Sequence, residues 1–326
     1  MTLHRRRVLQ AASGAAAAMA LPTWAQAKPW PQRAVRFVVP FAPGGSSEII
    51  ARATAFELTK SLGQTVYVEN KPGAAGNVAM QEVARSEDQH TLILGHIGTL
   101  AVNPYIFDRL PYDPNRDFKP VALLAKVPSL YLVHPDLPVK NLREFVDYVK
   151  KRPGQLSYGS AGNGSAGHLA MEYLKMATET FIVHVPYRGT GPQLTDLLAG
   201  RLQAASVGAA AVIQFVRTGR LRCIATGTPQ RLPQLPDVPT VAEQGWPGFE
   251  MTQWYGIMGP ANLPQAAVDT LASASMAALK QPATSEKFST DAVIGVGAGP
   301  AEFGRFIQQE QQRWKTVVDR ARIKPD

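Results

Sequence analysis

Hydrophobic and polar positions alternate along the chain in a pattern that predicts strands and helices following one another almost throughout after residue 30. Residues 35–39 form a β-branched and aromatic run typical of a buried strand. Beyond a turn rich in proline and glycine, apolar residues recur at helical spacing until Gly63 ends the predicted helix. The same order of strand, glycine turn and helix appears again at residues 156–176. Alternation of this kind predicts an α/β fold with mainly parallel sheets and flanking helices.

The remaining elements follow from the same periodicities. Asn77 is expected to cap one helix, and Asn141 with Glu144 three residues later predicts a capping-box start for another. Two amphipathic helices are predicted after Pro264 and after Pro300. The segment 227–249 is rich in proline and glycine and is expected to run over the surface, whereas 95–99 is expected to be a polar loop. Further strands are predicted at 65–68, 91–94, 121–133, 156–158, 181–185, 221–226 and 253–258, of which 121–133 is the candidate for crossing between two domains.

The two glycine turns are the candidate functional features. A strand that passes through glycines into a helix leaves free backbone N–H groups at the positive end of the helix dipole, and such a place can hold an anion. In open α/β sheets, ligands bind at the carboxyl ends of strands, where these turns lie. Two domains that each present one turn to a shared cleft would form a clamp for an organic anion. The candidate ligand-binding residues are Phe41, Pro43, Gly44, Gly45, Ser46, Ser47, Thr99, Ser160, Ala161, Gly162, Ser165 and Tyr187.

Residues 1–27 are typical of a secretory signal peptide. Arg5, Arg6 and Arg7 begin it, a short apolar run follows, and residues 25–27 form an A-x-A cleavage site. The arrangement also resembles a twin-arginine signal, although His4 stands where Ser or Thr is usual. Removal of this segment lowers the formal net charge from +9 to +6. The remaining basic residues are scattered among acidic ones, a pattern that argues against nucleic-acid binding. We therefore expect an exported protein.

Catalytic and metal-binding motifs give little support for an enzyme. The sequence contains no G-x-S-x-G elbow and no phosphate-binding loop of the Walker type, and its histidines lack the spacing of zinc ligands. Cys223, the only cysteine, lies in an apolar run and is expected to be a buried, inert thiol. No cofactor and no metal are expected. One alternative remains open: residues 162–167 match G-x-G-x-x-G, and Arg188 could receive a 2′-phosphate, so an exported NADP-dependent enzyme is a second hypothesis.

Six segments together resemble the Bug-type solute receptors of tripartite tricarboxylate transporters. They occur in the family's order across nearly all of the chain after the signal segment: 40–45, 68–77, 158–165, 184–189, 235–243 and 254–256. The resemblance implies a two-lobed periplasmic binding protein of the Venus-flytrap type, hinged between lobe 1 (28–125 plus 225–326) and lobe 2 (126–224). It also implies a small carboxylate ligand, membrane transporter subunits as partners and a monomer in the periplasm. Delivery of the ligand to a sensor kinase is an alternative with the same fold.

Departures from the family pattern bear on the ligand. Glu48 stands where the family usually has Asp, and His96 lies in a segment where relatives are richer in Ser and Thr, so His96 is a candidate for entering the cleft. Val207 aligns with a position where many members carry Asp. Since an acid in the cleft would suit an ammonium group and an apolar residue would not, the sequence favours a carboxylate that has no amino group.

Overall fold

The computed structural model describes residues 30–321 and 323–324, so the export segment predicted at 1–27 lies outside the described residues. Its strands are β1 (Val35–Val39), β2 (Val66–Asn70), β3 (Thr91–His96), β4 (Phe118–Val133), β5 (Ser157–Ser160), β6 (Val183–Pro186), β7 (Ala204–Gly208), β8 (Arg222–Thr226), β9 (Thr252–Pro260) and β10 (Ile294–Ala298). Its longer helices are α2 (Ser46–Leu62), α3 (Asn77–Ala84), α5 (Leu142–Lys150), α6 (Ala166–Thr178), α7 (Thr190–Leu198), α8 (Ala209–Arg217), α9 (Gln265–Leu279), α10 (Pro282–Thr290) and α11 (Pro300–Ala321). Short helical turns are η2 (Ala74–Gly76), η3 (Gly98–Val102) and α4 (Asn103–Ile106).

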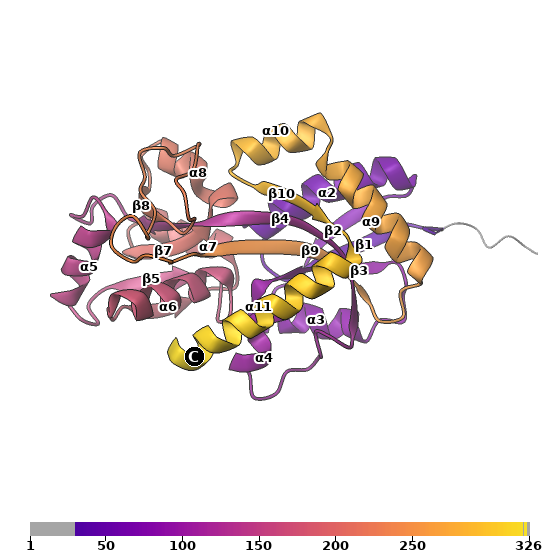
Figure 1. Ribbon diagram of the computed structural model, residues 1–326, viewed down its shortest axis with the longest axis horizontal. Coiled ribbons are helices and arrows are strands. Elements are labelled where there is room, and N and C mark those ends of the chain that lie inside the picture. The colour runs from indigo at the N-terminus through magenta and orange to yellow at the C-terminus, as the bar shows by residue number, and fades with distance from the viewer. Residues whose placement is uncertain (1–29, 322, 325–326) are drawn as a thin grey trace, which may run out of the picture.

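The strands form one continuous mixed sheet in the order β2-β1-β3-β9-β4-β7-β5-β6, with β8 and β10 also paired to β4 (Figure 1). Pairing is parallel among β1, β2 and β3 and among β5, β6 and β7. It is antiparallel wherever β4 or β9 takes part. The prediction of parallel pairing therefore holds for the outer strands, while the centre of the sheet is antiparallel.

Strand β4 joins the two halves of the sheet. Its residues 118–128 pair with β9, and its residues 129–133 pair with β7. We call the first half the ladder of β1, β2, β3, β9 and β10 with the first part of β4, and the second half the ladder of β5, β6, β7 and β8 with the last part of β4. The crossing strand predicted at 121–133 is confirmed.

Two apolar layers lie on opposite faces of the sheet because successive strand residues alternate between them. In β3, for example, Ile93 packs into one layer while Leu92 and Leu94 pack into the other. Helices α3, α5, α6 and α11 supply the first layer, and helices α2, α7, α8, α9 and α10 supply the second. Figure 1 shows α2, α9 and α10 above the central strands and α3 and α11 below them.

Several predicted helix boundaries are confirmed. Helix α2 ends at Gly63 in the left-handed conformation, and Asn141 caps α5 by accepting a hydrogen bond from the Glu144 N–H at 2.9 Å. The prediction that Asn77 caps α3 is wrong. Gly76 precedes that helix without a side-chain cap, and Asn77 Oδ1 instead accepts hydrogen bonds from Asn103 and Tyr112. A buried partner from elsewhere in the chain has displaced the local cap.

Besides the short helical turns, four elements were not predicted. Strand β7 and helix α8 occupy 204–217, where alanine-rich sequence obscures the change from strand to helix at Gly208. Helix α10 and strand β10 lie between the two amphipathic helices predicted near the C-terminus. The predicted polar loop at 95–99 is also different, because β3 extends to His96 and η3 starts at Gly98. Cys223 is buried, as predicted, and burial raises the pKa of its thiol to about 12.

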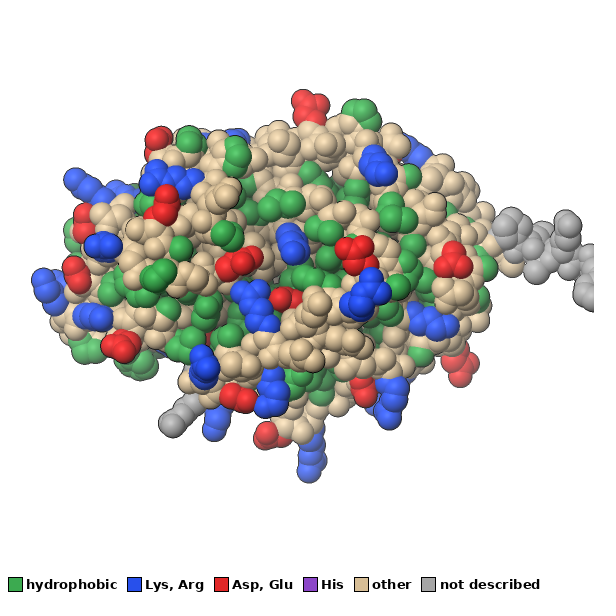
Figure 2. All heavy atoms as spheres, in the orientation of Figure 1, with side chains coloured by type: hydrophobic (Ala, Val, Ile, Leu, Met, Phe, Trp, Pro, Cys, Tyr) green, Lys and Arg blue, Asp and Glu red, His purple; other side chains and the backbone are tan. Residues whose placement is uncertain are grey.

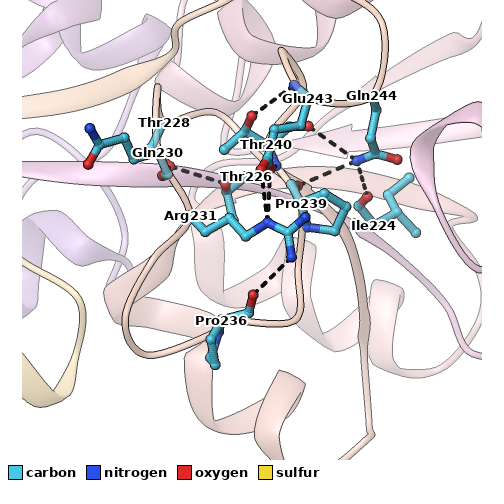
Figure 3. Close-up of polar contacts among 10 residues, drawn as sticks. All are labelled: Ile224, Thr226, Thr228, Gln230, Arg231, Pro236, Pro239, Thr240, Glu243 and Gln244. Carbon is cyan, nitrogen blue, oxygen red and sulfur yellow. Dashed lines mark hydrogen bonds and ion pairs between the residues drawn. The ribbon is translucent and has the colours of Figure 1, made fainter.

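The segment 227–249, predicted to run over the surface, is irregular and partly buried, and its own polar contacts fix it to the second half (Figure 3). Arg231 Nε lies 3.0 Å from the Glu243 carboxylate, which also accepts the Thr240 N–H at 2.7 Å. Gln244 Nε2 donates to the Ile224 carbonyl at 2.9 Å, at the end nearest β8. These hydrogen bonds, in place of those of a regular helix or strand, hold the backbone of this segment in position.

The surface carries basic and acidic side chains side by side. On the face shown in Figure 2, Lys and Arg are interspersed with Asp and Glu, with no broad area of one sign. In the part of the chain that the structure describes, no helix is both long and apolar enough to cross a bilayer.

Candidate functional site

A cavity lies where the two halves of the sheet meet. The first half contributes the turn after β1, the end of β3 and the start of β9. The second half contributes the turn after β5, the start of α7 and the end of β7. Its lining consists of Phe41, Ser46, Ser47, His96, Gln253 and Tyr255 from the first half and Ala161, Ser165, Ala166, Gly167, Thr190, Gln193, Ser206, Val207 and Gly208 from the second.

The N-termini of four helices reach the cavity. Ser46 and Ser47 begin α2, Ala166 and Gly167 begin α6, and Thr190 begins α7, while Gly208 is the N-cap of α8. Helices α2, α7 and α8 have glycine N-caps that make no side-chain capping bond. Because the first N–H groups of a helix lack intrahelical acceptors and lie at the positive end of its dipole, these starts favour a bound anion.

The described lining around these helix starts contains no charged side chain. Among the described residues that line the cavity there is no Lys, Arg, Asp or Glu. An anion bound here would therefore meet neutral donors alone, and a bound ammonium group would meet no carboxylate. The described residues also contain no group of three or more His, Cys, Asp or Glu side chains placed to hold a metal ion.

Three polar atoms of the lining have no hydrogen-bond partner. Ser46 Oγ, His96 Nε2 and Ser206 Oγ are buried, and their residues are 4%, 3% and 1% exposed. Among the described residues, seven buried side-chain nitrogen or oxygen atoms lack a partner, so nearly half of them lie around this one cavity. An unsatisfied buried polar group is costly, and a ligand with complementary groups would remove that cost.

The first glycine turn, residues 43–47, connects β1 to α2. The N–H of Gly44, a residue with φ of 96°, donates to Glu48 Oε2 at 2.8 Å and is therefore occupied within the protein. Gly45 lies so close to the start of α7 that an added Cβ would stand 2.9 Å from Thr190 Oγ1. Glu48, the residue that departs from the family pattern, thus secures this turn from one helical turn away.

The second glycine turn, residues 160–167, connects β5 to α6 and satisfies its own polar groups. Ser160 Oγ lies 2.7 Å from His184 Nε2 and accepts the Gly162 N–H at 3.1 Å. Ser165 caps α6 by accepting the His168 N–H at 3.3 Å. The glycines of this turn are required by neighbouring protein atoms: a Cβ at Gly164 would stand 2.5 Å from Asn103 Oδ1. That contact accounts for glycine there without a dinucleotide.

His96 is held in one tautomer at the end of β3. Its Nδ1 accepts the Gly98 N–H at 2.6 Å, so the ring proton lies on Nε2, the nitrogen that is buried without a partner. Burial lowers the pKa of His96 to about 3, which keeps the ring neutral. The ring stacks on Phe41 with centroids 4.6 Å apart.

The structure brings five of the twelve predicted ligand-binding residues into the cavity wall. These are Phe41, Ser46, Ser47, Ala161 and Ser165. The other seven are not part of the lining: Pro43, Gly44, Gly45, Thr99, Ser160, Gly162 and Tyr187. The Thr99 hydroxyl bonds to the His96 backbone, and the Tyr187 hydroxyl donates to Asp196 Oδ2 at 2.7 Å. Contact of any of the twelve with a ligand stays a prediction.

The sequence did not predict most of the cavity-lining residues that lie away from the two glycine turns. His96 and Val207, which had drawn attention as departures, do line the cavity. Gln253 and Tyr255 stand two residues apart in β9, and the Tyr255 hydroxyl donates to Gln253 Oε1 at 2.6 Å. Two polar side chains on one face of an otherwise apolar strand were the available signal.

Comparison with known proteins gives consistent matches over most of the chain. The model of the family described as "Tripartite tricarboxylate transporter family receptor" matches residues 50–323. A Pseudomonas sp. (strain P51) protein from a tcbD-tcbE intergenic region is 33% identical over 325 residues, covering 98% of this chain and 96% of its own. Protein BugT of Bordetella pertussis is 34% identical over 306 residues, covering 93% of each.

Solved structures match as well. Periplasmic binding protein BugD superposes with a TM-score of 0.88 at 32% identity, covering 91% of this chain and all of that one. An R. palustris protein solved with adipate also gives 0.88, at 35% identity and the same coverage. MatC from Rhodopseudomonas palustris, with bound malate, gives 0.86 at 34% identity, covering 89% of this chain and all of that one. The two-lobed α/β fold of a periplasmic binding protein is thereby confirmed.

Proposed function

This chain belongs to the tripartite tricarboxylate transporter receptor family, and on that premise we propose that it is a periplasmic receptor that binds a small organic carboxylate and delivers it to a transporter of that type. The adipate and malate in two similar structures support a carboxylate as the ligand class. In this proposal the protein acts as a monomer, without catalysis, and its partners are the membrane subunits of the transporter.

The observation that carries the proposal is the convergence of four helix N-termini on a cavity without charged side chains. Backbone N–H groups and hydroxyls hold a carboxylate by directed hydrogen bonds with little desolvation of counter-charges. The absence of an acidic side chain from the described lining removes the usual partner of an ammonium group. The favoured ligand is therefore an acid without an amino group.

We further propose that the ligand closes two lobes about a hinge. The sequence divides them into lobe 1 at 28–125 plus 225–326 and lobe 2 at 126–224, and the bonds of segment 227–249 to the second half favour a later return to lobe 1, before β9. Both halves of the sheet line the cavity, so a ligand there would contact both. A ligand that bridges two lobes binds the closed form better than the open form and shifts the equilibrium toward it.

Calorimetric titration of the purified protein tests the ligand class. Succinate, glutarate, malate and adipate are compared with aspartate, which has the carbon skeleton of succinate and malate, and with glutamate, which has that of glutarate. Binding of one or more of the unsubstituted or hydroxylated acids is expected, and each amino acid should bind more weakly than its deaminated counterpart. Tighter binding of glutamate than of glutarate, or of aspartate than of succinate, would contradict the proposal.

Two further measurements separate the neighbouring hypotheses. Uptake of the labelled acid by cells that lack this gene should fall and be restored by the wild-type gene; unchanged uptake with an altered transcriptional response would favour a sensor role. A titration with NADP should leave the melting temperature unchanged, whereas stabilisation by NADP would favour the enzyme hypothesis.

A further inference from the structure

His96 lines a cavity whose described wall contains no Lys, Arg, Asp or Glu. Its ring lies between the Phe41 ring, stacked at 4.6 Å, and the Tyr255 ring, in edge contact at 6.3 Å. Gly98 adjoins it closely, since a Cβ on Gly98 would stand 2.5 Å from His96 Cε1 and 2.2 Å from the Gly164 carbonyl of the second half. The ring therefore has little freedom to turn and lies beside the boundary of the two halves.

The hydrogen bonds of the ring define what it can offer a ligand. Nδ1 is occupied as an acceptor by the Gly98 N–H at 2.6 Å and more weakly by the Thr99 N–H at 3.4 Å. Nε2 is buried and has no partner among the described residues. A neutral imidazole whose Nδ1 accepts must carry its proton on Nε2, so the free atom is a donor.

The surroundings keep the ring uncharged. The groups packed against it are the aromatic rings of Phe41 and Tyr255 and the backbone of Gly98 and Thr99, and the described cavity lining contributes no acid or base. Tyr255 is the other titratable group, and burial raises the pKa of its hydroxyl above the ordinary value. No anion stabilises an imidazolium here, so the donor persists over the ordinary pH range.

The free donors divide unequally between the two halves. Helices α6, α7 and α8 and the Ser206 hydroxyl belong to the second half, whereas the first half offers α2, Ser46 Oγ and His96 Nε2–H. A carboxylate held mainly by the three helix starts of the second half leaves the donors of the first half for another part of the same ligand.

We propose that His96 is a specificity-determining residue: its Nε2–H donates to a second acceptor oxygen of the bound acid, so that the receptor selects acids with oxygens at both ends and rejects a donor group at that place. This inference rests on the proposed function, because it specifies how the same cavity chooses among carboxylates. A ligand that ends in a methyl group would leave the Nε2–H unsatisfied, and one that ends in an ammonium would face it donor to donor.

Two variants separate the two nitrogen atoms of the ring. His96→Asn places an amide oxygen near the position of Nδ1, keeping an acceptor for the Gly98 N–H while removing the donor to the ligand. His96→Gln extends an amide N–H₂ to about the position of Nε2 and keeps the donor. Binding of succinate and adipate is measured by calorimetry beside butyrate and hexanoate, the monoacids of the same length, with malate as a further diacid.

The diacids should bind about 10-fold or more weakly to His96→Asn than to the wild type, and His96→Gln should recover most of that loss. The monoacids should change by less than about twofold in either variant. Diacid affinity for the wild type should also be the same at pH 6 and pH 8. Equal losses in both variants, equal losses for monoacids and diacids, or affinity that rises toward pH 6 would overturn the assignment.

A measurement on the ligand-free wild type tests the tautomer of His96 directly, so this test does not depend on how well a variant folds. Nitrogen NMR of ¹⁵N-labelled wild-type protein should show His96 as the neutral Nε2–H tautomer from pH 5 to pH 8, and an imidazolium or an Nδ1–H tautomer would overturn the inference. If diacids bind and only the pattern across variants or the tautomer is wrong, the inference fails while the proposed function stands. If none of the acids binds to the wild type, the proposed function fails, and the inference fails with it.

Discussion

The two glycine turns have similar sequences and make opposite use of their polar atoms. In the first turn, residues 43–47, Ser46 Oγ is buried in the cavity wall and has no partner. In the second turn, residues 160–167, Ser160 Oγ is engaged by His184 and by the Gly162 N–H, and Ser165 caps its own helix. The Ser46 hydroxyl of the first turn thus lacks a partner without a ligand, while the two serine hydroxyls of the second turn are satisfied within the protein.

The difference shows that a strand-glycine-serine-helix pattern locates such a turn in the sequence. The pattern does not reveal whether the serine hydroxyls of the turn are free or hydrogen-bonded. One partner of the second turn comes from outside it: His184 from β6, itself stacked on His168 at 4.3 Å. The first turn has one outside partner, Glu48, and that partner takes a backbone N–H rather than a serine hydroxyl. A serine in the second turn therefore belongs to the scaffold that positions the cavity.

The largest expected effect comes from separating the first turn from the second half. Gly191 lies in α7, and an added Cβ would stand 2.6 Å from the Pro43 carbonyl oxygen. Gly191→Ala should weaken carboxylate binding by about 100-fold, which corresponds to about 2.7 kcal/mol, because the halves can no longer meet as they do here. Alanine suits a helix better than glycine, so α7 itself should not lose stability.

Calorimetry and thermal unfolding of the ligand-free protein together test this prediction. Gly299→Ala is the matched control, since a Cβ at that position meets no atom within 4 Å. Wild-type affinity in Gly191→Ala, or an equal loss in Gly299→Ala, would show that the contact between Pro43 and Gly191 does not govern binding.

The next effect concerns pH and the histidine beside the first turn. Burial lowers the pKa of His96 to about 3, whereas a histidine in the unfolded chain titrates near 6.5. Below pH 6.5 the unfolded state binds a proton that the folded state does not, so stability falls as the pH drops from 6.5 toward 3. At pH 5 this loss amounts to about 2 kcal/mol relative to pH 8.

Urea unfolding at pH 8 and pH 5 measures the effect, and His96→Gln provides the reference because glutamine does not titrate. The wild type should lose about 2 kcal/mol more than the variant between the two pH values. An identical loss in both proteins would mean that the ring is protonated as readily when folded as when unfolded.

The smallest effect sharpens the contrast between the two serines. Ser46→Ala should reduce carboxylate affinity about 10-fold with little change in melting temperature, since its hydroxyl makes no hydrogen bond of ordinary geometry within the protein. Ser160→Ala should lower the free energy of unfolding by about 1 kcal/mol, because His184 and Gly162 lose their partner. The two variants are compared by calorimetry and by thermal unfolding. Reversed results, with affinity lost mainly in Ser160→Ala, would exchange the roles of the two turns.

Periodicity predicted much of the fold because most elements bury one regular face. Residues 35–39 and 142–149 show such faces plainly, and both elements form where expected. Strand β7 and helix α8 were not predicted because alanine suits either structure, so only packing determines which residues form a strand and which a helix. The alanines concerned are Ala204, Ala205, Ala209 and Ala210. The antiparallel centre of the sheet depends on how β4 and β9 meet across a long separation in sequence, which no local pattern encodes.

The parts of the candidate site that are formed by a local turn in the chain were predictable from the sequence. The starts of α2 and α6 follow directly from their glycine turns and line the cavity at Ser46 and Ser165. His96, Ser206 and Tyr255 enter from three strands whose neighbours are set by tertiary pairing, so no spacing along the chain relates them. Whether a hydroxyl is free or satisfied depends on such neighbours as well.

Strand β4 has a mechanical consequence. Because its residues 118–128 belong to one ladder and its residues 129–133 to the other, a rotation of one half against the other must be absorbed as torsion in an unbroken strand. Pro128 stands at the changeover, where the ring removes an N–H from the ladder and fixes one backbone angle. The torsional stiffness of those few peptide units therefore contributes to the free-energy difference between the open and closed arrangements of the two halves. That contribution raises or lowers the affinity with which the cavity binds its ligand.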